Sequence, residues 1–179
     1  AAAVLRRKEI LDTRPSEVAQ ALIIKEVGRK PRDTFILVRG NANVEGEKVE
    51  PAFPSVLSPP DPVIKTPVMT ESSGRRTALA NWIASDKNQL TARVMVNRIW
   101  QHHFGRGIVG SSNNFGNIGD KPTHPELLDW LATRFMQGGW KLKAMHKLIM
   151  LSSTYQMSSQ ASESELAADP ANKLYWRFN

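Results

Sequence analysis

The sequence predicts a mainly α-helical protein with a long glycine-rich loop and a short extended or β segment near the N-terminus. After Ser73, apolar residues recur at helical spacing through most of the remaining chain. The fifteen residues from Gly105 to Gly119 contain five glycines among Ser and Asn, which indicates a long loop. Six prolines crowd the stretch from Pro51 to Pro67. Each proline removes a backbone donor and fixes φ, so this stretch is expected to be extended.

Composition divides the chain into three regions. Residues 1–33 are expected to form an N-terminal helical extension, with a helix around residues 18–27. Residues 34–72 are expected to form an extended, proline-rich connector that opens with a strand at 34–39, TFILVR. Residues 73–179 are expected to form a helical core domain, truncated at its C-terminus because its last residues carry no helix stop signal.

The core domain is expected to contain four helices and a short fifth. They are predicted from Ser73 to about 86–88, and at 90–104, 123–137, 141–153 and 162–168. In the third of these helices, Thr123 is expected to cap free amides, with Pro125 in the first turn and Glu126 completing a capping box. Gly105 is expected to end the second helix, and the pair Gly138-Gly139 is expected to end the third.

Composition also excludes several classes of site. The chain has no cysteine, which removes disulfides, zinc–thiolate sites, covalent c-type haem attachment and thiol nucleophiles from this segment. No apolar run approaches the roughly 20 residues that a membrane span requires. The formal charge of +7 would attract nucleic acid, acidic polysaccharide, anionic lipid or an acidic partner. No block of five like charges occurs, which favours Arg and Lys side chains that are solvated or paired locally.

A candidate polar cluster stands out in the core domain. Spacings of four and three place Arg93, Asn97 and Trp100 on one stripe of the second helix, where Arg and Trp could bind a planar or anionic ligand. We favour a structural interpretation, in which Arg93 and Asn97 bond backbone carbonyls of the glycine loop, because buried polar groups must be satisfied. Asp129 is expected to pair with Arg93 or Arg98, and in the structural interpretation Arg93, Asn97, Arg98 and Asp129 are all expected to be buried and paired. The candidate residues are Arg93, Asn97, Arg98, Trp100, His103, His124 and Asp129.

The glycine loop is the candidate ligand-facing element, because long glycine loops are often functional. It lacks the GxxxxGK[ST] pattern and follows a helix rather than a strand, so it does not match either phosphate-loop fingerprint. Its candidate residues are Gly105, Arg106, Gly107, Asn113, Asn114 and Gly116.

Other chemistries have little support in the sequence. His102 and His103 are adjacent, so they point about 100° apart on a helix, and no HExxH motif is present, so no metal site is predicted. No serine lies in a GxSxG context, so no nucleophile or other catalytic residue is identified and enzymatic activity is left open. The glycine loop is too long for the compact turn of a helix–turn–helix, which disfavours nucleic-acid binding.

Several long motifs resemble one known family. They are RTALANWIASDKNQLTARVMVNRIWQHHFGRGIVGSSNNFG, PTHPELLDWLA and GWKLKAMHKLIMLSSTYQMSS, with FILVRGNANVEGEKVEPAFPSVL upstream and DPANKLYWRFN downstream. Over roughly residues 34–179 the chain resembles the planctomycete-type domain of unknown function that occurs in large proteins with cytochrome-c-like domains. The core of the resemblance is the run ARVMVNRIWQHHFGRG.

This resemblance implies an extracytoplasmic location and a large multidomain parent protein, whose other domains would be the partners of this segment. The segment has no CxxCH motif, so it is expected to hold no cofactor, and any haem would lie elsewhere in the parent protein. Three functions are compatible with the sequence. The favoured one is a structural or interaction module of unknown activity. The alternatives are an enzyme domain, hydrolytic on extracellular polysaccharide, and a module that binds anionic glycans.

Overall fold

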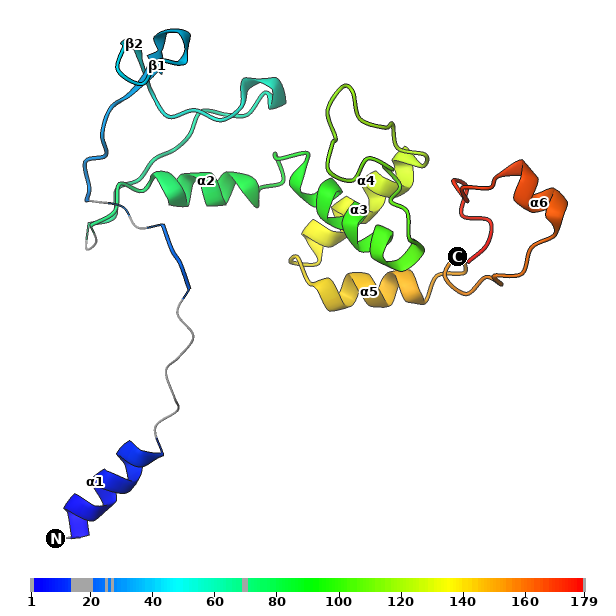
Figure 1. Cartoon of the computed structure of the whole chain (residues 1–179), viewed down its shortest axis with the longest axis horizontal. Coiled ribbons are helices and arrows are strands. Elements are labelled where there is room, and N and C mark those ends of the chain that lie inside the picture. Colours follow the sequence, from blue (N-terminus) through cyan, green and yellow to red (C-terminus); the bar gives the residue numbers. More distant parts are fainter. Residues whose placement is uncertain (1, 14–20, 25, 27, 69–70, 179) are drawn as a thin grey trace.

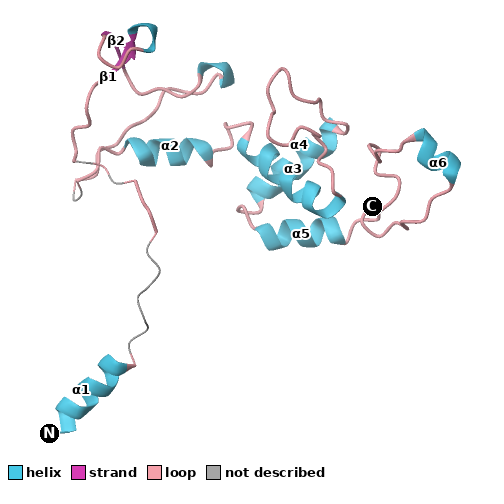
Figure 2. Cartoon of the chain, viewed as in Figure 1, coloured by secondary structure: helices cyan, strands magenta, loops and turns pink. Residues whose placement is uncertain are grey.

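The computed structural model describes residues 2–13, 21–24, 26, 28–68 and 71–178. Within these residues the chain is mainly helical, as predicted, with one small antiparallel sheet near the N-terminus (Figures 1 and 2). The elements are α1 (Ala2–Asp12), β1 (Thr34–Leu37), η1 (Val38–Gly40), β2 (Glu45–Val49), η2 (Ser55–Leu57), α2 (Arg75–Ile83), α3 (Thr91–Phe104), α4 (Pro125–Gln137), α5 (Leu142–Met150) and α6 (Glu163–Ala168).

The hydrophobic core is built around α3, which contacts both α4 and α5 (Figure 1). Each of the three helices buries one apolar stripe with spacings of three or four residues, as amphipathic helices do. The helix α3 ends at Gly105, whose φ of 74° is left-handed, which confirms the predicted C-cap. The buried apolar side chains of these helices are Ala92, Val96, Ile99, Trp100, Phe104, Leu128, Leu131, Ala132, Phe135, Met145 and Ile149.

The segment after α5 turns back and closes the core over the end of α3. The buried ring of Tyr175 lies 5.2 Å from Trp100 and 5.6 Å from Phe104 between centroids. The Tyr175 hydroxyl donates a hydrogen bond of 3.3 Å to the backbone oxygen of Arg106, 69 residues earlier. The ring of Phe178 packs edge-on against Tyr155 at 5.0 Å. Residues far apart in the sequence therefore complete one core.

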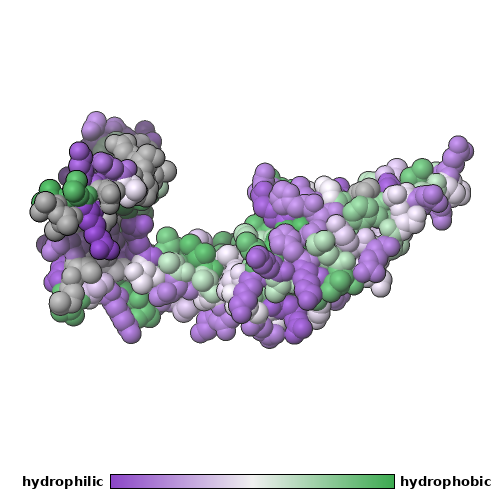
Figure 3. Space-filling view, turned by 90° about the horizontal axis from the view of Figure 1, so that it is seen from below, coloured by the Kyte–Doolittle hydropathy of each residue, from purple (hydrophilic) through white to green (hydrophobic). Residues whose placement is uncertain are grey.

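The N-terminal half stands outside this core. Among the described residues, every buried hydrophobic side chain is at Ala92 or later. The β1–β2 hairpin pairs Thr34 with Val49 and has no buried residue, and two strands alone are marginally stable. Apolar surface is visible over the stretch that contains α2 (Figure 3). Large exposed apolar residues of this half include Leu22, Ile23, Ile24, Val56, Val63 and Val68.

Two sequence expectations about the N-terminal half need correction. The helix expected around 18–27 is not found: residues 21–24 and 26 are not helical, and 18–20, 25 and 27 lie outside the described residues. A helix does form, but earlier, as α1. The strand expected at 34–39 is confirmed over Thr34–Leu37, as β1, whereas Val38–Gly40 form the 3-10 helix η1. The connector also contains β2, which was not predicted because its charged EGEKV sequence lacks an apolar strand pattern.

The predicted capping box of α4 is also wrong. His124 is the N-cap residue of α4 and no side chain caps the helix, although Pro125 occupies the first turn as expected. Thr123 instead donates its backbone N–H to the oxygen of Ile108 at 2.9 Å, with its hydroxyl 3.3 Å from the same oxygen. This residue therefore ties the end of the glycine loop to its beginning. A capping box forms at α6, between Ser162 and Glu165.

The burial pattern of α5 gives a direct test of the core. Ile149 is 2% exposed, so Ile149→Ala leaves a cavity and should lower the free energy of unfolding by about 2–5 kcal/mol. The matched control is Met150→Ala, because the neighbouring Met150 is 46% exposed. This substitution should lower the free energy of unfolding by no more than about 1 kcal/mol. Urea denaturation of the three proteins measures both effects. Equal losses would mean that α5 does not face α3 as described.

Candidate functional site

The central contact of the candidate polar cluster joins Asn97 of α3 to the glycine loop. Its side-chain amide donates to the backbone oxygen of Val109 at 3.1 Å and accepts from the backbone N–H of Val109 at 2.8 Å. Asn97 is 0% exposed, so both bonds are shielded from water. A Cβ at Gly107 would lie 2.6 Å from the Asn97 nitrogen, so only glycine lets the loop pass this close. The predicted bonding of Asn97 to the loop is confirmed.

Arg93 makes a different contact from the one expected. It donates to the carboxylate of Asp129 on α4 at 2.6 Å and to the backbone oxygen of Gln89 at 2.6 Å, not to the glycine loop. The hydrogen bond from Arg93 lowers the pKa of Asp129 below its usual range. The predicted pairing of Asp129 is therefore confirmed with Arg93. The expectation that both are buried is wrong, because their side chains are 31% and 56% exposed.

Arg98 is likewise paired but not buried. It lies on the exposed face of α3 and donates to the side-chain oxygen of Asn113 in the glycine loop at 2.6 Å. Within the loop, Arg106 lies 3.7 Å from the carboxylate of Asp120, and the Asn114 side chain accepts from the N–H of Gly116 at 3.0 Å. The candidate ligand-facing residues are thus engaged in contacts that hold the loop in shape.

Histidines link α3 to α5. His103 Nε2 lies 2.8 Å from His146 Nδ1, which is hydrogen-bonding distance for rings of opposite donor and acceptor roles. The Tyr155 ring packs edge-on against His103 at 5.3 Å. Burial, followed by the charges of His146 and His102, lowers the pKa of His103. His124 lies elsewhere, with its Nδ1 2.9 Å from the Thr123 hydroxyl and its ring beside Tyr175.

The seven candidate residues therefore do not converge on one site. Arg93 and Asp129 line a hollow of about 330 Å³ between the glycine loop and α4, whereas Trp100 lies at the opposite side of α4, against α5. Among the residues that the structure describes, no group of three or more His, Asp or Glu side chains could hold a metal ion. The arrangement can position a loop and fasten helices, but it presents no paired acid and base around a common cavity.

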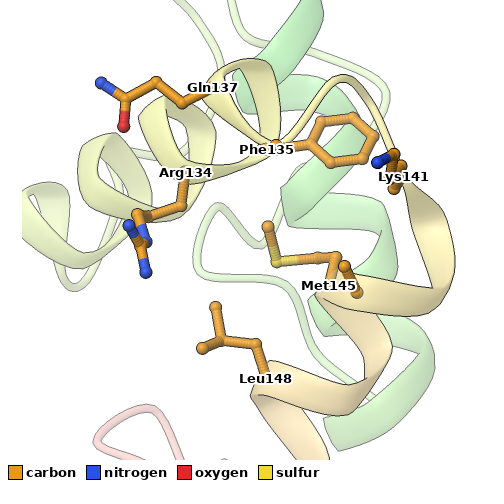
Figure 4. Close-up of a pocket in the computed structure, with 8 residues that line it drawn as sticks. Arg134, Phe135, Gln137, Lys141, Met145 and Leu148 are labelled. Atoms are coloured by element: carbon orange, nitrogen blue, oxygen red, sulfur yellow. The ribbon is translucent and has the colours of Figure 1, made fainter.

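A surface feature that was not predicted from the sequence lies between α4 and α5. Two adjoining hollows of about 290 and 550 Å³ share Ala144 and Leu148 and form one groove, named here the α4–α5 groove. Figure 4 shows the first hollow, with Met145 and Leu148 of α5 facing Arg134 and Phe135 of α4. The available signals were the exposed apolar residues Trp130, next to the core residue Leu131 on α4, and Leu151, which directly follows α5. The remaining lining residues are Gln137, Gly138, Lys141, Trp100, Leu127, Leu131, Lys147, Ile149, Ser152 and Thr154.

The fold and these contacts define a helical domain whose polar residues hold a long glycine loop against α3. The chain belongs to the DUF1553 family of proteins of unknown function, whose model matches residues 75–179. The match runs from α2 through the closing C-terminal segment and leaves out the β1–β2 hairpin. Comparisons with curated proteins and with solved structures find no match. None of the described helices combines the length and apolar character needed to cross a membrane.

The Asn97 contact predicts a large and specific loss of stability. Asn97→Ala removes both partners of Val109 and leaves a buried N–H and C=O unpaired, which should lower the free energy of unfolding by about 2–4 kcal/mol. Asn113→Ala is the control, because Asn113 is a loop residue whose partner Arg98 is exposed, and should change stability by only about 0.5 kcal/mol. Guanidinium denaturation measures both, and a mild effect of Asn97→Ala would remove its central role.

The His103–His146 contact predicts a pH dependence of stability. Since the folded-state pKa of His103 lies below the ordinary 6.5, the unfolded chain binds this proton more readily than the folded chain. The stability that neutral His103 contributes to the fold is therefore fully present above pH 6.5, and it is lost as the pH falls through the lowered pKa of His103. When both rings of the pair carry two protons, neither has an acceptor nitrogen, so the hydrogen bond between them is lost.

Thermal unfolding between neutral and mildly acidic pH measures this effect. His103→Gln should flatten the fall in melting temperature with decreasing pH. His102→Gln should retain most of the fall, because the His102 charge is a smaller cause of the lowered His103 pKa than burial. An unchanged profile for His103→Gln would contradict the assignment.

Proposed function

We propose that the chain is a non-catalytic structural and interaction module of a large extracytoplasmic multidomain protein, and that its partners are other domains of that protein. One observation carries this proposal: the polar residues that distinguish the sequence are used in separate structural contacts. Asn97 holds the glycine loop, Arg93 holds α4, and His103 holds α5. The location and the larger parent protein rest on the resemblance to large exported proteins with cytochrome-c-like domains.

Unburied apolar surface supports a role in interaction. The N-terminal half leaves Leu22, Ile23 and Ile24 more than 70% exposed, and Val56, Val63 and Val68 are similarly open. Exposed apolar side chains grouped on one part of a protein mark sites of association. Docking of this half against another domain of the parent protein would bury them and would also support the two-stranded hairpin.

The enzyme alternative would need a cavity in which an acid and a base converge on a bound substrate. Arg93 and Asp129 share a hollow, but their hydrogen bond to one another occupies the groups that would act. The glycan-binding alternative depends on the +7 charge alone. Both alternatives make a measurable prediction that differs from that of the proposed module.

Incubation with a panel of neutral, acidic and sulfated polysaccharides separates these functions. We expect no release of reducing ends above the protein-free control, because the candidate polar residues that the structure describes do not converge on one cavity. Retention on a sulfated polysaccharide matrix should be weak at physiological salt, since exposed charges are largely screened there. Turnover that disappears in Arg93→Ala, with the fold retained by circular dichroism, would establish the enzyme alternative instead.

The same proposal is tested in a longer protein that contains the neighbouring domains. Hydrogen exchange should be slower at residues 21–24 and 56–68 there than in the separate chain, because docking excludes water from these segments. Residues 96–104, whose backbone lies within the helix α3, are the internal control and should exchange alike in both proteins. Equal exchange at the N-terminal segments would contradict docking through this half.

A further inference from the structure

The α4–α5 groove is a concave, largely apolar surface next to the core. Its floor includes Trp100, Leu131 and Ile149, which are 2–4% exposed and held by the packing of three helices. Its rim includes Trp130, 49% exposed, and Leu151, 64% exposed. A rigid floor with open apolar edges is a preformed surface, so a ligand that fills it does not have to order the groove.

The charges around the groove have one sign. Arg134, Lys141 and Lys147 line it, and none of its described lining residues is Asp or Glu. From Trp130 to Ser162 the sequence contains four Arg or Lys residues and no acidic residue, in a chain of net charge +7. On α4 the carboxylate of Asp129, adjacent to Trp130 in the sequence, is hydrogen-bonded to Arg93 of α3. Glu126, one turn before Trp130 on α4, does not line the groove. A bound cation would therefore be repelled and a bound anion attracted.

We propose that the α4–α5 groove binds an acidic amphipathic helix of a protein partner. An apolar channel between two helices, bordered by cations, complements a helix with an apolar stripe flanked by Asp and Glu. The Arg134 guanidinium lies 5.9 Å from the Trp130 ring, and Trp and Arg are the residues most enriched at the energetic centres of protein interfaces. This proposal rests on the proposed interaction function and assigns it a site and a partner chemistry.

A lipid surface is the competing occupant, since it is also apolar and anionic. Peripheral membrane helices present an apolar face that enters the bilayer boundary, whereas this apolar surface is recessed between α4 and α5 with Trp100 at its floor. A recessed channel suits a rod-shaped ligand that enters it. The protein helix is therefore the occupant that the shape favours, and vesicle binding becomes an outcome of the test.

The test uses the full chain and three labelled synthetic peptides of about 18 residues, five helical turns. The first carries Leu along one helical face and Glu on the other. The second replaces every Glu with Lys, and the third scrambles the first so that its faces are mixed. Fluorescence anisotropy should give a dissociation constant for the acidic amphipathic peptide at least about tenfold lower than for the other two.

Three variants locate the site. Arg134→Glu combined with Lys147→Glu should weaken binding of the acidic peptide at least about tenfold, and Trp130→Ala should weaken it similarly. Lys143→Glu is the control for one such exchange: it lies on α5 and makes the same change in charge as Lys147→Glu alone, but it does not line the groove, so binding should stay within about twofold. Circular dichroism confirms that each variant retains its helices.

The opposite results overturn the proposal. Equal affinity for the acidic and scrambled peptides, no saturable binding, or equal weakening by Lys143→Glu would each remove the groove as a helix site. Preferential binding to phosphatidylglycerol vesicles, lost in Trp130→Ala, would assign the groove to a lipid surface. If the peptide does not bind, but hydrogen exchange at residues 21–24 is still slower in the longer protein than in the separate chain, the groove proposal is overturned and the proposed interaction function stands. Arg93-dependent polysaccharide turnover would overturn the function whatever the groove binds.

Discussion

The fold depends on one buried side chain, Asn97, which hydrogen-bonds both the backbone N–H and the backbone C=O of a single loop residue, Val109. A fifteen-residue loop full of glycine has a high conformational entropy and few apolar side chains with which to pack. The pair of bonds to Val109 fixes its first part, so that Ile108 and Val109 become core residues. The Thr123 bond to Ile108 then fixes the other end, which sets where α4 begins.

The remaining polar contacts fasten the helices to this central unit at different points. Arg93 joins α3 to α4, Arg98 joins α3 to the loop, and His103 joins α3 to α5. Because each contact has its own partner, the polar residues of α3 are spread over separate contacts with the glycine loop, α4 and α5. The proposed interaction function therefore relies on the apolar surfaces of the N-terminal half and of the α4–α5 groove.

Local features of this fold could be read from the sequence, and contacts across the chain could not. The stripes of α3 and α4, Gly105 as a C-cap and the tie from Asn97 to the loop, twelve residues away, follow from periodicity, from glycine chemistry and from the need to satisfy buried groups. The His103–His146 contact spans 43 residues, and nothing in the local pattern encodes such a distance. Thr123 was misread because a tertiary bond to Ile108 replaced the cap that local sequence favours. The expectation that Arg98 and Asp129 are buried was wrong, because both lie on solvent-exposed faces of their helices.

The closing role of Tyr175 has a consequence for the order in which the molecule assembles. The aromatic packing around Trp100 and Phe104 is completed only when a residue about 70 positions later reaches them, and long-range contacts of this kind slow folding. During synthesis α3, α4 and α5 emerge first, with that aromatic surface still open to water. Until Tyr175 has left the ribosome this surface is exposed to aggregation, so its burial has to wait for the translation of the segment around Tyr175.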